Sequence, residues 1–321
     1  MSTLTPLPRS SGSVGETKPE VQTRRRTLMK QVEERAAWSF LLPWFIGMLV
    51  ITIGPMIASL YFSFTDYNLL RAPSWIGLEN YEQMMKDPRL LKSLGVTFVY
   101  VLIGVPALLV VALSLAMVLN RGIRGLPIYR SVFYLPSLLG GSVAIGILWR
   151  QLFGTDGLVN QFLALFGIEG PGWISNPSTA LTSLIMLHIW SFGSSMVIFL
   201  AGLRQIPEDL YEAASLDGAG KWMQFRNVTL PLLTPILFFN LILQIINSFQ
   251  TFTQAFVVSG GTGGPADSTL FYSLYLYEQG FGQLNMGYAS AMAWLLVVII
   301  GVATAVNFYF SKRWVFYSDR D

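Results

Sequence analysis

The sequence predicts an all-α membrane protein that crosses the bilayer six times. Its 321 residues are 53% hydrophobic and only 12% charged, which is about half the charge of an ordinary soluble domain. The mean hydropathy is +0.52. The apolar residues are also gathered into long runs that short polar stretches separate, and this pattern favours membrane helices over a buried soluble core.

Six apolar runs contain the roughly 20 residues that a helix needs to cross a bilayer. They occupy residues about 38–64, 93–119, 128–152, 178–203, 231–258 and 287–313. We therefore expect one six-span domain, residues 38–316, that includes a long polar loop at 204–230 between the fourth and fifth spans. Short tails, residues 1–37 and 317–321, flank it.

The N-terminal tail contains few apolar residues. Its first 25 residues are rich in Ser, Thr, Pro and Gly, a composition that predicts disorder. The first apolar run is too long and too far from the start for a secretory signal. Residues 26–37 could form a short helix on the inner membrane surface or remain a solvated basic segment.

The distribution of basic residues predicts the orientation. Sixteen of the 21 Lys and Arg residues fall in the two tails, in the second loop with its membrane edge, and in the loop at 204–230. Because basic residues accumulate on the cytoplasmic side, both termini and this loop are expected there. The net charge of +3 is too small to indicate a nucleic-acid partner.

No catalytic constellation is visible. The absence of cysteine excludes disulfides, thiol catalysis and cysteine-ligated metal. No nucleotide-binding G-x-x-x-x-G-K-[ST] motif occurs, and no span carries a pair of carboxylates. The one histidine, His188, has no second histidine beside it and is expected to pack inside the bundle. We therefore predict no catalytic and no metal-binding residues, which disfavours an integral-membrane enzyme.

The loop at 204–230 predicts two short helices. Pro207 suits a first helical turn, and Glu208 and Asp209 complement the positive end of the helix dipole. Gly218 and Gly220 are expected to end this helix. A second helix over 221–228 follows. On the first helix Ile206, Leu210, Ala213 and Ala214 share one face, which the small alanines leave open to a close partner. An amphipathic connector lying on the bilayer is the alternative.

The full spacing of this loop resembles a known signature. Glu212-Ala213-Ala214, Gly218 and Leu230-Pro231 match the EAA motif of ABC importer permeases, with Val228 in place of its isoleucine. The match lies in a cytoplasmic loop before the penultimate span, as that family requires. The resemblance implies that an ATPase subunit contacts this loop. The implicated residues are Glu212, Ala213, Ala214, Asp217, Gly218, Leu230 and Pro231.

Further segments resemble carbohydrate-importer permeases of the maltose-transporter type. They are "SFTDYN" at 63–68, "WIGLENYEQMMKDP" at 75–88, "YRSVFYLP" at 129–136, "ILWRQLFGTDGLVNQFL" at 147–163 and "FVVSGGTGGPADST" at 256–269. The resemblance implies the ABC importer permease fold in a prokaryotic inner membrane. It also implies a heterodimer with a second homologous permease, two copies of a cytoplasmic ATPase, and an extracytoplasmic sugar-binding protein. ATP and Mg²⁺ would bind the ATPase, and this chain would bind no cofactor.

A polar stripe on the fifth span predicts where a solute could pass. Its members are spaced four and three residues apart, as on one helical face: Asn240, Gln244, Asn247, Thr251 and Gln254, with Gln250 beside them. Amides cannot face lipid without leaving polar groups unsatisfied. The stripe therefore faces either a sugar path or neighbouring helices through interhelical hydrogen bonds. On the fourth span Trp190 and Ser194 could contact a sugar ring.

No Lys or Arg lies in the middle of any span, which favours a neutral mono- or oligosaccharide because an anion would favour a fixed positive charge. An importer of a related polar solute, such as a glycerol phosphate or an acidic sugar, stays open. An ATP-independent channel or facilitator is the less favoured class. In the third span Gly140-Gly141, with Pro136 and Gly146, could bend during transport or pack closely against another helix.

Overall fold

The computed structural model describes residues 37–122 and 125–316, and these described residues are helices joined by turns and loops. Within them, the one bridge between extended segments joins Thr65 and Trp75. The expected all-α class is therefore confirmed. The chain divides into two compact units, Met1–Ala58 and Ser59–Asp321, which are described separately.

The first unit contains most of one apolar helix, Ala37–Phe62. The helix widens into a π-turn over Met48–Ile53 (η1) and continues as α2 (Gly54–Phe62). The amide of Gly54 bonds to the carbonyl of Leu49, five residues back, and the next residue is Pro55, which has no amide hydrogen to donate. This widening is the form that one-turn π-bulges take inside α-helices.

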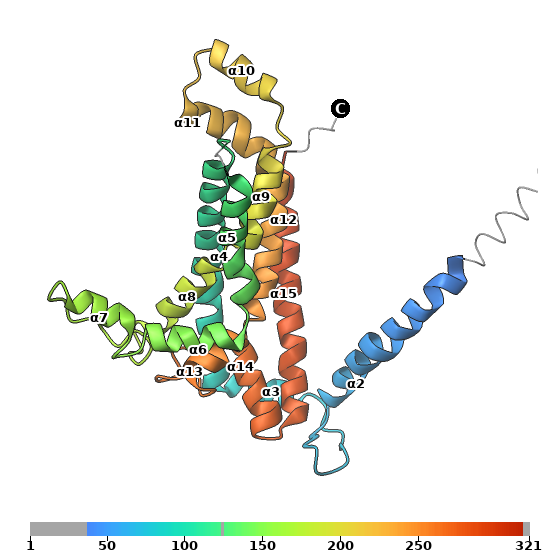
Figure 1. Cartoon of the computed structure of the whole chain (residues 1–321). Coiled ribbons are helices and arrows are strands. Elements are labelled where there is room, and N and C mark those ends of the chain that lie inside the picture. The colour runs from blue at the N-terminus through green and yellow to red at the C-terminus, as the bar shows by residue number, and fades with distance from the viewer. Residues whose placement is uncertain (1–36, 123–124, 317–321) are drawn as a thin grey trace, which may run out of the picture. The chain divides into compact units, whose positions relative to one another are not determined.

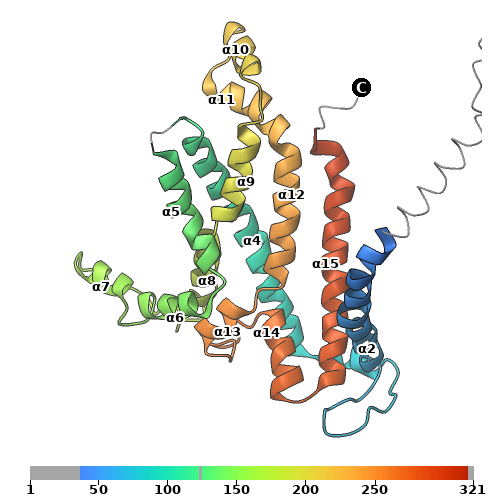
Figure 2. The ribbon, with the colours of Figure 1, turned by 45° about the vertical axis from the view of Figure 1, so that its right-hand side comes forward.

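The second unit holds the remaining helices (Figures 1 and 2). They are α3 (Glu79–Lys86), α4 (Pro88–Leu119), α5 (Leu126–Leu139), α6 (Val143–Leu152), α7 (Leu158–Ala164), α8 (Ala180–Trp190), α9 (Gly193–Leu203), α10 (Glu208–Leu216), α11 (Lys221–Gln224), η2 (Phe225–Thr229), α12 (Leu230–Phe249), α13 (Thr253–Ser259), α14 (Tyr272–Tyr277), η3 (Glu278–Gly282) and α15 (Met286–Trp314).

Helix α4 is the centre of the second unit and packs against α8, α9 and α12. Two hydrophobic clusters lie along it. One surrounds Leu108, Phe199 and Leu233, from α4, α9 and α12. The other surrounds Tyr100, Leu187 and Tyr272, from α4, α8 and α14. Large side chains in these two clusters thus join helices that are far apart in the sequence.

Among the described residues, candidate spans number four by length and composition, or up to six if each of two bent helix pairs counts as one span. The straight ones are Ala37–Phe62, Pro88–Leu119, Lys221–Phe249 and Met286–Trp314. The bent pairs are α5 with α6, at 97°, and α8 with α9, at 41°. The third expected span, 128–152, is therefore two helices. Its first part, α5, has 14 residues and is about 21 Å long, shorter than the ~30 Å hydrocarbon core.

Small residues form the break between α5 and α6. Gly140 lies so close to α8 that an added Cβ would be 2.9 Å from the Cβ of Ser191. Ser142 then caps α6 by accepting a hydrogen bond from the amide of Ile145. Gly146 touches α13, where an added Cβ would be 2.8 Å from Val257 Cγ1. Glycine at 140 and 146 thus serves close packing beside the bend.

The fifth span also differs from its expected bounds of 231–258. It begins ten residues earlier, at Lys221, because α11, η2 and α12 are continuous, and it ends at Phe249. Gln250, Thr251 and Phe252 then leave the helix before α13 begins at Thr253. The apolar sequence continues through this turn, so hydropathy alone does not reveal it.

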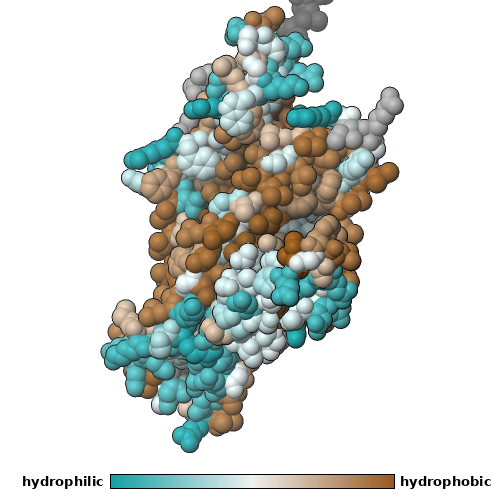
Figure 3. Space-filling view, turned by 90° about the vertical axis from the view of Figure 1, so that its left-hand side faces the viewer, coloured by the Kyte–Doolittle hydropathy of each residue, from teal (hydrophilic) through white to brown (hydrophobic). Residues whose placement is uncertain are grey.

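Short helices of the second unit gather at its two ends (Figures 1 and 2). Helices α10 and α11 lie at one end with the last described residues, and the backbone amide of Phe316 donates to Thr234 Oγ1 near the start of α12. Helices α3, α6, α13 and α14 lie at the other end. Figure 3 shows on one face a hydrophobic band between two hydrophilic ends, as expected for a membrane protein.

Candidate functional site

The loop between α9 and α12 folds into the two short helices that the sequence predicts, α10 and α11. Helix α10 ends in a Schellman motif: the amide of Ala219 donates to the carbonyl of Ala214, and that of Gly218 to Ser215. Gly218 has φ +80°, a conformation that favours glycine because it has no Cβ. This turn sends the chain back toward the bundle.

Side-chain bonds hold α10 against the following helix. The hydroxyls of Tyr211 and Thr229 are 2.9 Å apart. The amide of Gln224 donates to Ser215 Oγ at 2.8 Å and to the carbonyl of Ala219 at 3.1 Å. The two helices therefore form one folded unit at the end of the bundle rather than a loose connector.

The signature residues divide into an exposed group and a structural group. Glu212, Ala213, Asp217 and Gly218 are exposed, and Ala214 is half-buried. The other two are also half-buried: Leu230 begins α12 and Pro231 follows it at the first turn. Leu230 and Pro231 therefore position the loop, whereas the exposed group can contact another protein.

Two large apolar side chains beside the exposed group extend this surface. Leu216 is 89% exposed and Trp222 is 72% exposed, next to the half-exposed Met223. Leu216 lies three residues after Ala213, a spacing that places both on one face of α10, yet no expectation from the sequence named it. Ile206, expected on the open face, instead packs against the core of the bundle.

Three members of the fifth-span stripe bond within the protein. Asn240 is buried and its amide donates to the carbonyl of Ile236 on its own helix. The amide of Gln244 donates to Ser195 Oγ of α9 at 3.0 Å. Gln254, on α13, donates to the carbonyl of Gly140 at 3.0 Å. The contacts of Gln244 and Gln254 match the interhelical bonding that the sequence left open as the alternative, whereas the bond of Asn240 stays within α12.

Three other members of the stripe lie near the C-terminal end of α12. Asn247 is exposed on the helix, and Gln250, at its C-cap, is exposed as well. Thr251 follows the helix and donates to the carbonyl of Asn247 at 3.4 Å. Because α12 ends at Phe249, the stripe is not one continuous helical face. Of its amides, those of Asn247 and Gln250 are exposed to a solute.

The two fourth-span candidates are separated by the break between α8 and α9. Trp190, at the end of α8, packs on the hydrophobic cluster with its ring centroid 6.3 Å from that of Trp149. Ser194, in the first turn of α9, is exposed and lines a cavity of about 370 Å³ with Arg130 and Tyr134 of α5. The structure therefore does not bring Trp190 and Ser194 into one site.

His188 packs inside the bundle, as expected. Its Nε2 atom is 3.3 Å from Ser248 Oγ of α12, and its ring lies against Gly104 of α4, where an added Cβ would be 3.1 Å from Cδ2. The described residues contain no group of three or more His, Asp or Glu side chains able to hold a metal ion.

An acid at the opposite end of the bundle joins three helices. Asp87 caps α4 by accepting from the amides of Arg89 and Leu90, and its Oδ2 accepts from the hydroxyls of Tyr275 and Tyr288, each at 2.7 Å. Burial opposes its ionisation, but these hydrogen bonds outweigh burial and lower the pKa of Asp87. Burial and the bond to Asp87 raise the pKa of Tyr275.

Arg89 ties the glycine-rich loop at 259–268 to the start of α4. Its guanidinium forms a two-bond fork with Asp267, at 3.1 and 3.0 Å, and reaches Glu278 at 2.8 Å. The partners are 178 and 189 residues away along the chain, so no local sequence pattern could have identified them. Through Asp267 the loop is therefore anchored to the start of α4.

Comparison with protein families gives one match over most of the chain. Residues 83–316 match the family described as "Binding-protein-dependent transport system inner membrane component". Among curated proteins, the chain is 49% identical over 304 residues to a "Probable ABC transporter permease protein YesP" of Bacillus subtilis (strain 168), covering 94% of this chain and 98% of that protein.

Two further relatives carry sugar names. A "Probable starch degradation products transport system permease protein AmyD" of Thermoanaerobacterium thermosulfurigenes is 32% identical, covering 86% of this chain and 94% of that protein. A "Lactose transport system permease protein LacF" of Rhizobium radiobacter is 31% identical, covering 91% and 99%.

The fold is similar to a chain of a solved bacterial alginate ABC transporter, in complex with an alginate pentasaccharide-bound periplasmic protein. The TM-score is 0.75 at 22% identity, covering 89% of this chain and 97% of that chain. A second structure, of a bacterial ABC transporter "involved in the import of the acidic polysaccharide alginate", gives a TM-score of 0.71 at 21% identity, covering 90% and 99%. At this identity the likeness concerns the fold alone.

Proposed function

The chain belongs to the family of binding-protein-dependent transport system inner membrane components, and from this premise we propose that it is the permease subunit of an ATP-driven sugar importer. The α10–α11 loop is the observation that carries the proposal. It presents Glu212, Ala213 and Gly218 on an exposed, internally bonded surface. The sugar names of relatives that share more than 30% of their residues with this chain support the substrate class.

In this proposal the α10–α11 loop docks on a cytoplasmic ATPase subunit. Small alanines permit a close approach, and the exposed side chains of Leu216 and Trp222 supply apolar area to bury. Because α11 is continuous with α12, movement of the docked loop would pass into the fifth span. A change of this kind requires that the ATPase bind the two states of the permease with different affinity.

The remaining partners follow from the same assignment. A second homologous permease would complete the translocation path, a second ATPase copy would dock on that subunit, and an extracytoplasmic binding protein would deliver the sugar. The excess of Lys and Arg in the tails and the 204–230 loop supports cytoplasmic termini in a prokaryotic inner membrane.

For the sugar path we propose the exposed amides near the end of α12, Asn247 and Gln250. Each amide offers both donors and an acceptor to sugar hydroxyls. Gln244 and Gln254 would instead hold helices together through the bonds described above, and the amide of Asn240 is buried and bonded within α12. The absence of Lys and Arg from the middle of the spans supports a neutral mono- or oligosaccharide over an acidic one.

Replacement of Glu212 by Lys tests the coupling role. We expect Glu212→Lys to abolish ATP-dependent uptake and co-purification of the ATPase while the subunit stays in the membrane. Glu82→Lys, an equal charge reversal at an exposed site on α3, serves as the control and keeps both. Normal uptake and normal ATPase recovery with Glu212→Lys would exclude this docking surface. A facilitator would conduct sugar alone in liposomes without any ATPase.

A second pair of variants tests the path. Asn247→Ala combined with Gln250→Ala is expected to change the KM or the sugar preference of uptake, with ATPase docking intact. Gln244→Ala, which removes the bond to Ser195, is expected to lower the melting temperature without altering sugar preference. Unchanged uptake kinetics of the double variant would assign these amides to packing. Competition by matched neutral and acidic oligosaccharides tests the preference for a neutral sugar.

A further inference from the structure

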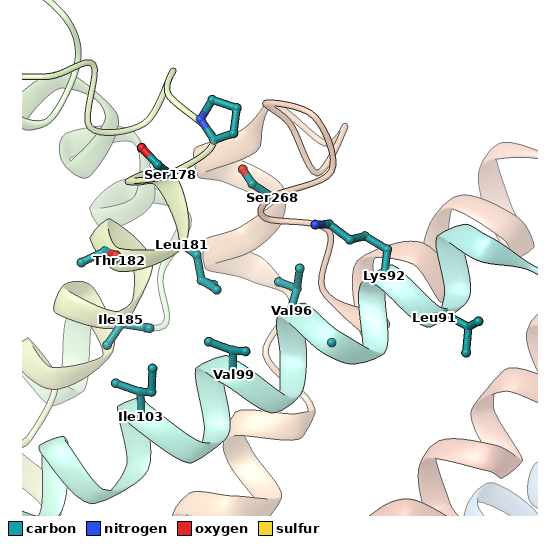
Figure 4. A pocket seen from close by; sticks show the side chains of 12 residues that line it. Leu91, Lys92, Val96, Val99, Ile103, Ser178, Leu181, Thr182, Ile185 and Ser268 are labelled. Carbon is teal, nitrogen blue, oxygen red and sulfur yellow. The ribbon is translucent and has the colours of Figure 1, made fainter.

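A cavity of about 510 Å³ lies between α4 and α8, at the end of the bundle opposite α10 and α11 (Figure 4). Its lining is polar at one end and, apart from Thr182, apolar along the rest. The polar end contains Lys92, Ser178 and Ser268, and the aliphatic part contains Val96, Val99, Ile103, Leu181 and Ile185. No sugar-path or ATPase-docking residue proposed above takes part in it.

The polar end contains an unsatisfied group. Ser268 is 9% exposed, and its Oγ is buried without a hydrogen-bond partner among the described residues. A buried hydroxyl without a partner is unfavourable. Lys92 extends over the cavity toward Ser268 (Figure 4) and forms no salt bridge within the described part of the chain. The neighbouring acid, Asp267, is bound by Arg89. An acceptor carrying negative charge would satisfy both groups.

The aliphatic part continues this site along one helix face. Lys92, Val96, Val99 and Ile103 are spaced four, three and four residues apart, which places them in one row on α4. From Lys92 to Ile103 the row is roughly 16 Å long. Gly95 adds room beside it, since no heavy atom lies within 4 Å of the Cβ that a larger residue would have.

We propose that this cavity binds an anionic phospholipid. The phosphate accepts hydrogen bonds from the Lys92 ammonium and the Ser268 hydroxyl, and one acyl chain lies along Val99 and Ile103. The polar end falls near the beginnings of the candidate spans that contain α4 and α8, where headgroups meet the hydrocarbon core. A sugar would leave its hydroxyls unpaired against the aliphatic wall, and a free phosphate would make no use of that wall.

The test uses full-length protein, purified in detergent and stripped of lipid, with thermal melting and native mass spectrometry as readouts. Phosphatidylglycerol, phosphatidylcholine and inorganic phosphate are added separately. We expect phosphatidylglycerol alone to raise the melting temperature and to remain bound. Lys92→Gln should weaken its apparent affinity about fivefold, the effect of one basic residue on an anionic lipid, while Lys86→Gln on α3 should leave it unchanged.

Gly95→Leu fills the cavity without meeting the backbone and should abolish the phosphatidylglycerol-dependent shift. Gly301→Leu on α15, which also has nothing within 4 Å of an added Cβ, is the matched control and should keep it. Ser268→Ala should bind the lipid more weakly, yet be at least as stable as the wild type without lipid because its unpaired hydroxyl is gone.

Equal shifts with phosphatidylcholine or with inorganic phosphate would overturn the proposal. So would equal shifts in Gly95→Leu and Gly301→Leu. The last test compares wild type and Gly95→Leu in the transporter assembled with its partner chains. We expect phosphatidylglycerol to be recovered with the wild type and not with Gly95→Leu. If the wild type also lacks the lipid, another protein covers this face, and the lipid assignment is wrong.

Discussion

Two glycines in the α10–α11 loop allow one backbone angle to be tested by itself. Gly218 and Gly220 are exposed and lie two residues apart, and an added Cβ would meet nothing within 4 Å at either position. Gly218 has φ +80°, whereas Gly220 has φ −68°. An alanine therefore fits the space at both positions, but it fits the backbone only at Gly220.

The expected cost follows from this difference. An L-residue in the left-handed region costs about 1–2 kcal/mol. This cost corresponds to roughly a 5- to 30-fold shift in the equilibrium between the hydrogen-bonded and the opened form of the turn that ends α10. Gly218→Ala has this cost. The two backbone hydrogen bonds of the Schellman motif, from Gly218 to Ser215 and from Ala219 to Ala214, should therefore open more often. Gly220→Ala avoids the cost.

Hydrogen exchange of the two motif amides is the direct assay. In Gly218→Ala the amides of residues 218 and 219 should exchange faster by roughly the factor above, and co-purification of the proposed ATPase should fall. Gly220→Ala should match the wild type in both. Gly218→Asn should lie between them, because asparagine enters the left-handed region more readily than alanine.

Equal exchange and equal ATPase recovery in Gly218→Ala and Gly220→Ala would refute the reasoning. The loop would then not depend on the left-handed residue that ends α10. Faster exchange with unchanged ATPase recovery would support the backbone argument for Gly218 but would exclude a role of this turn in docking the ATPase.

Two further predictions concern stability in detergent. Gly146→Ala should lower the free energy of unfolding by about 1–3 kcal/mol because its Cβ would overpack against Val257, whereas Gly141→Ala, with nothing within 4 Å, should melt like the wild type; equal melting would exclude close packing at α13. Asp87 has a lowered pKa, so its contribution to stability is complete above about pH 4 and declines as the pH falls further. Asp87→Asn should reduce the stability at neutral pH and remove this acid-dependent decline, which pH-dependent melting curves would detect; an unchanged profile would contradict the role of the bonds from Tyr275 and Tyr288.

Local signals in the sequence were sufficient for the helical class and for the α10–α11 loop. The positions of Pro207 and Gly218 are properties of the chain itself: a ring without an amide hydrogen suits a helix start, and a residue without Cβ suits a left-handed turn. Long apolar runs likewise identified the membrane helices. Each of these signals lies within a single helix or turn, so the local sequence contains it.

For the polar stripe, local sequence signals could not distinguish a solute path from hydrogen bonds between helices. The spacing of Asn240, Gln244 and Gln254 fits one helical face, but helical periodicity does not reveal that α12 ends at Phe249. Nor can it tell that Gln244 meets Ser195 on α9 or that Gln254 meets the carbonyl of Gly140. The residue type does not tell whether a side-chain amide is free or hydrogen-bonded, because its partner lies on a helix elsewhere in the sequence.

The sequence by itself determined that this protein is helical, membrane-embedded and equipped with a polar loop of two short helices, because hydropathy, charge and turn propensity act locally. Only the tertiary structure decided the 97° bend between α5 and α6, the pairing of Arg89 with Asp267 and Glu278, and the unpaired hydroxyl of Ser268 beside the cavity. Each depends on close packing or hydrogen bonds between residues that are distant in the chain, and these form only when the helices assemble.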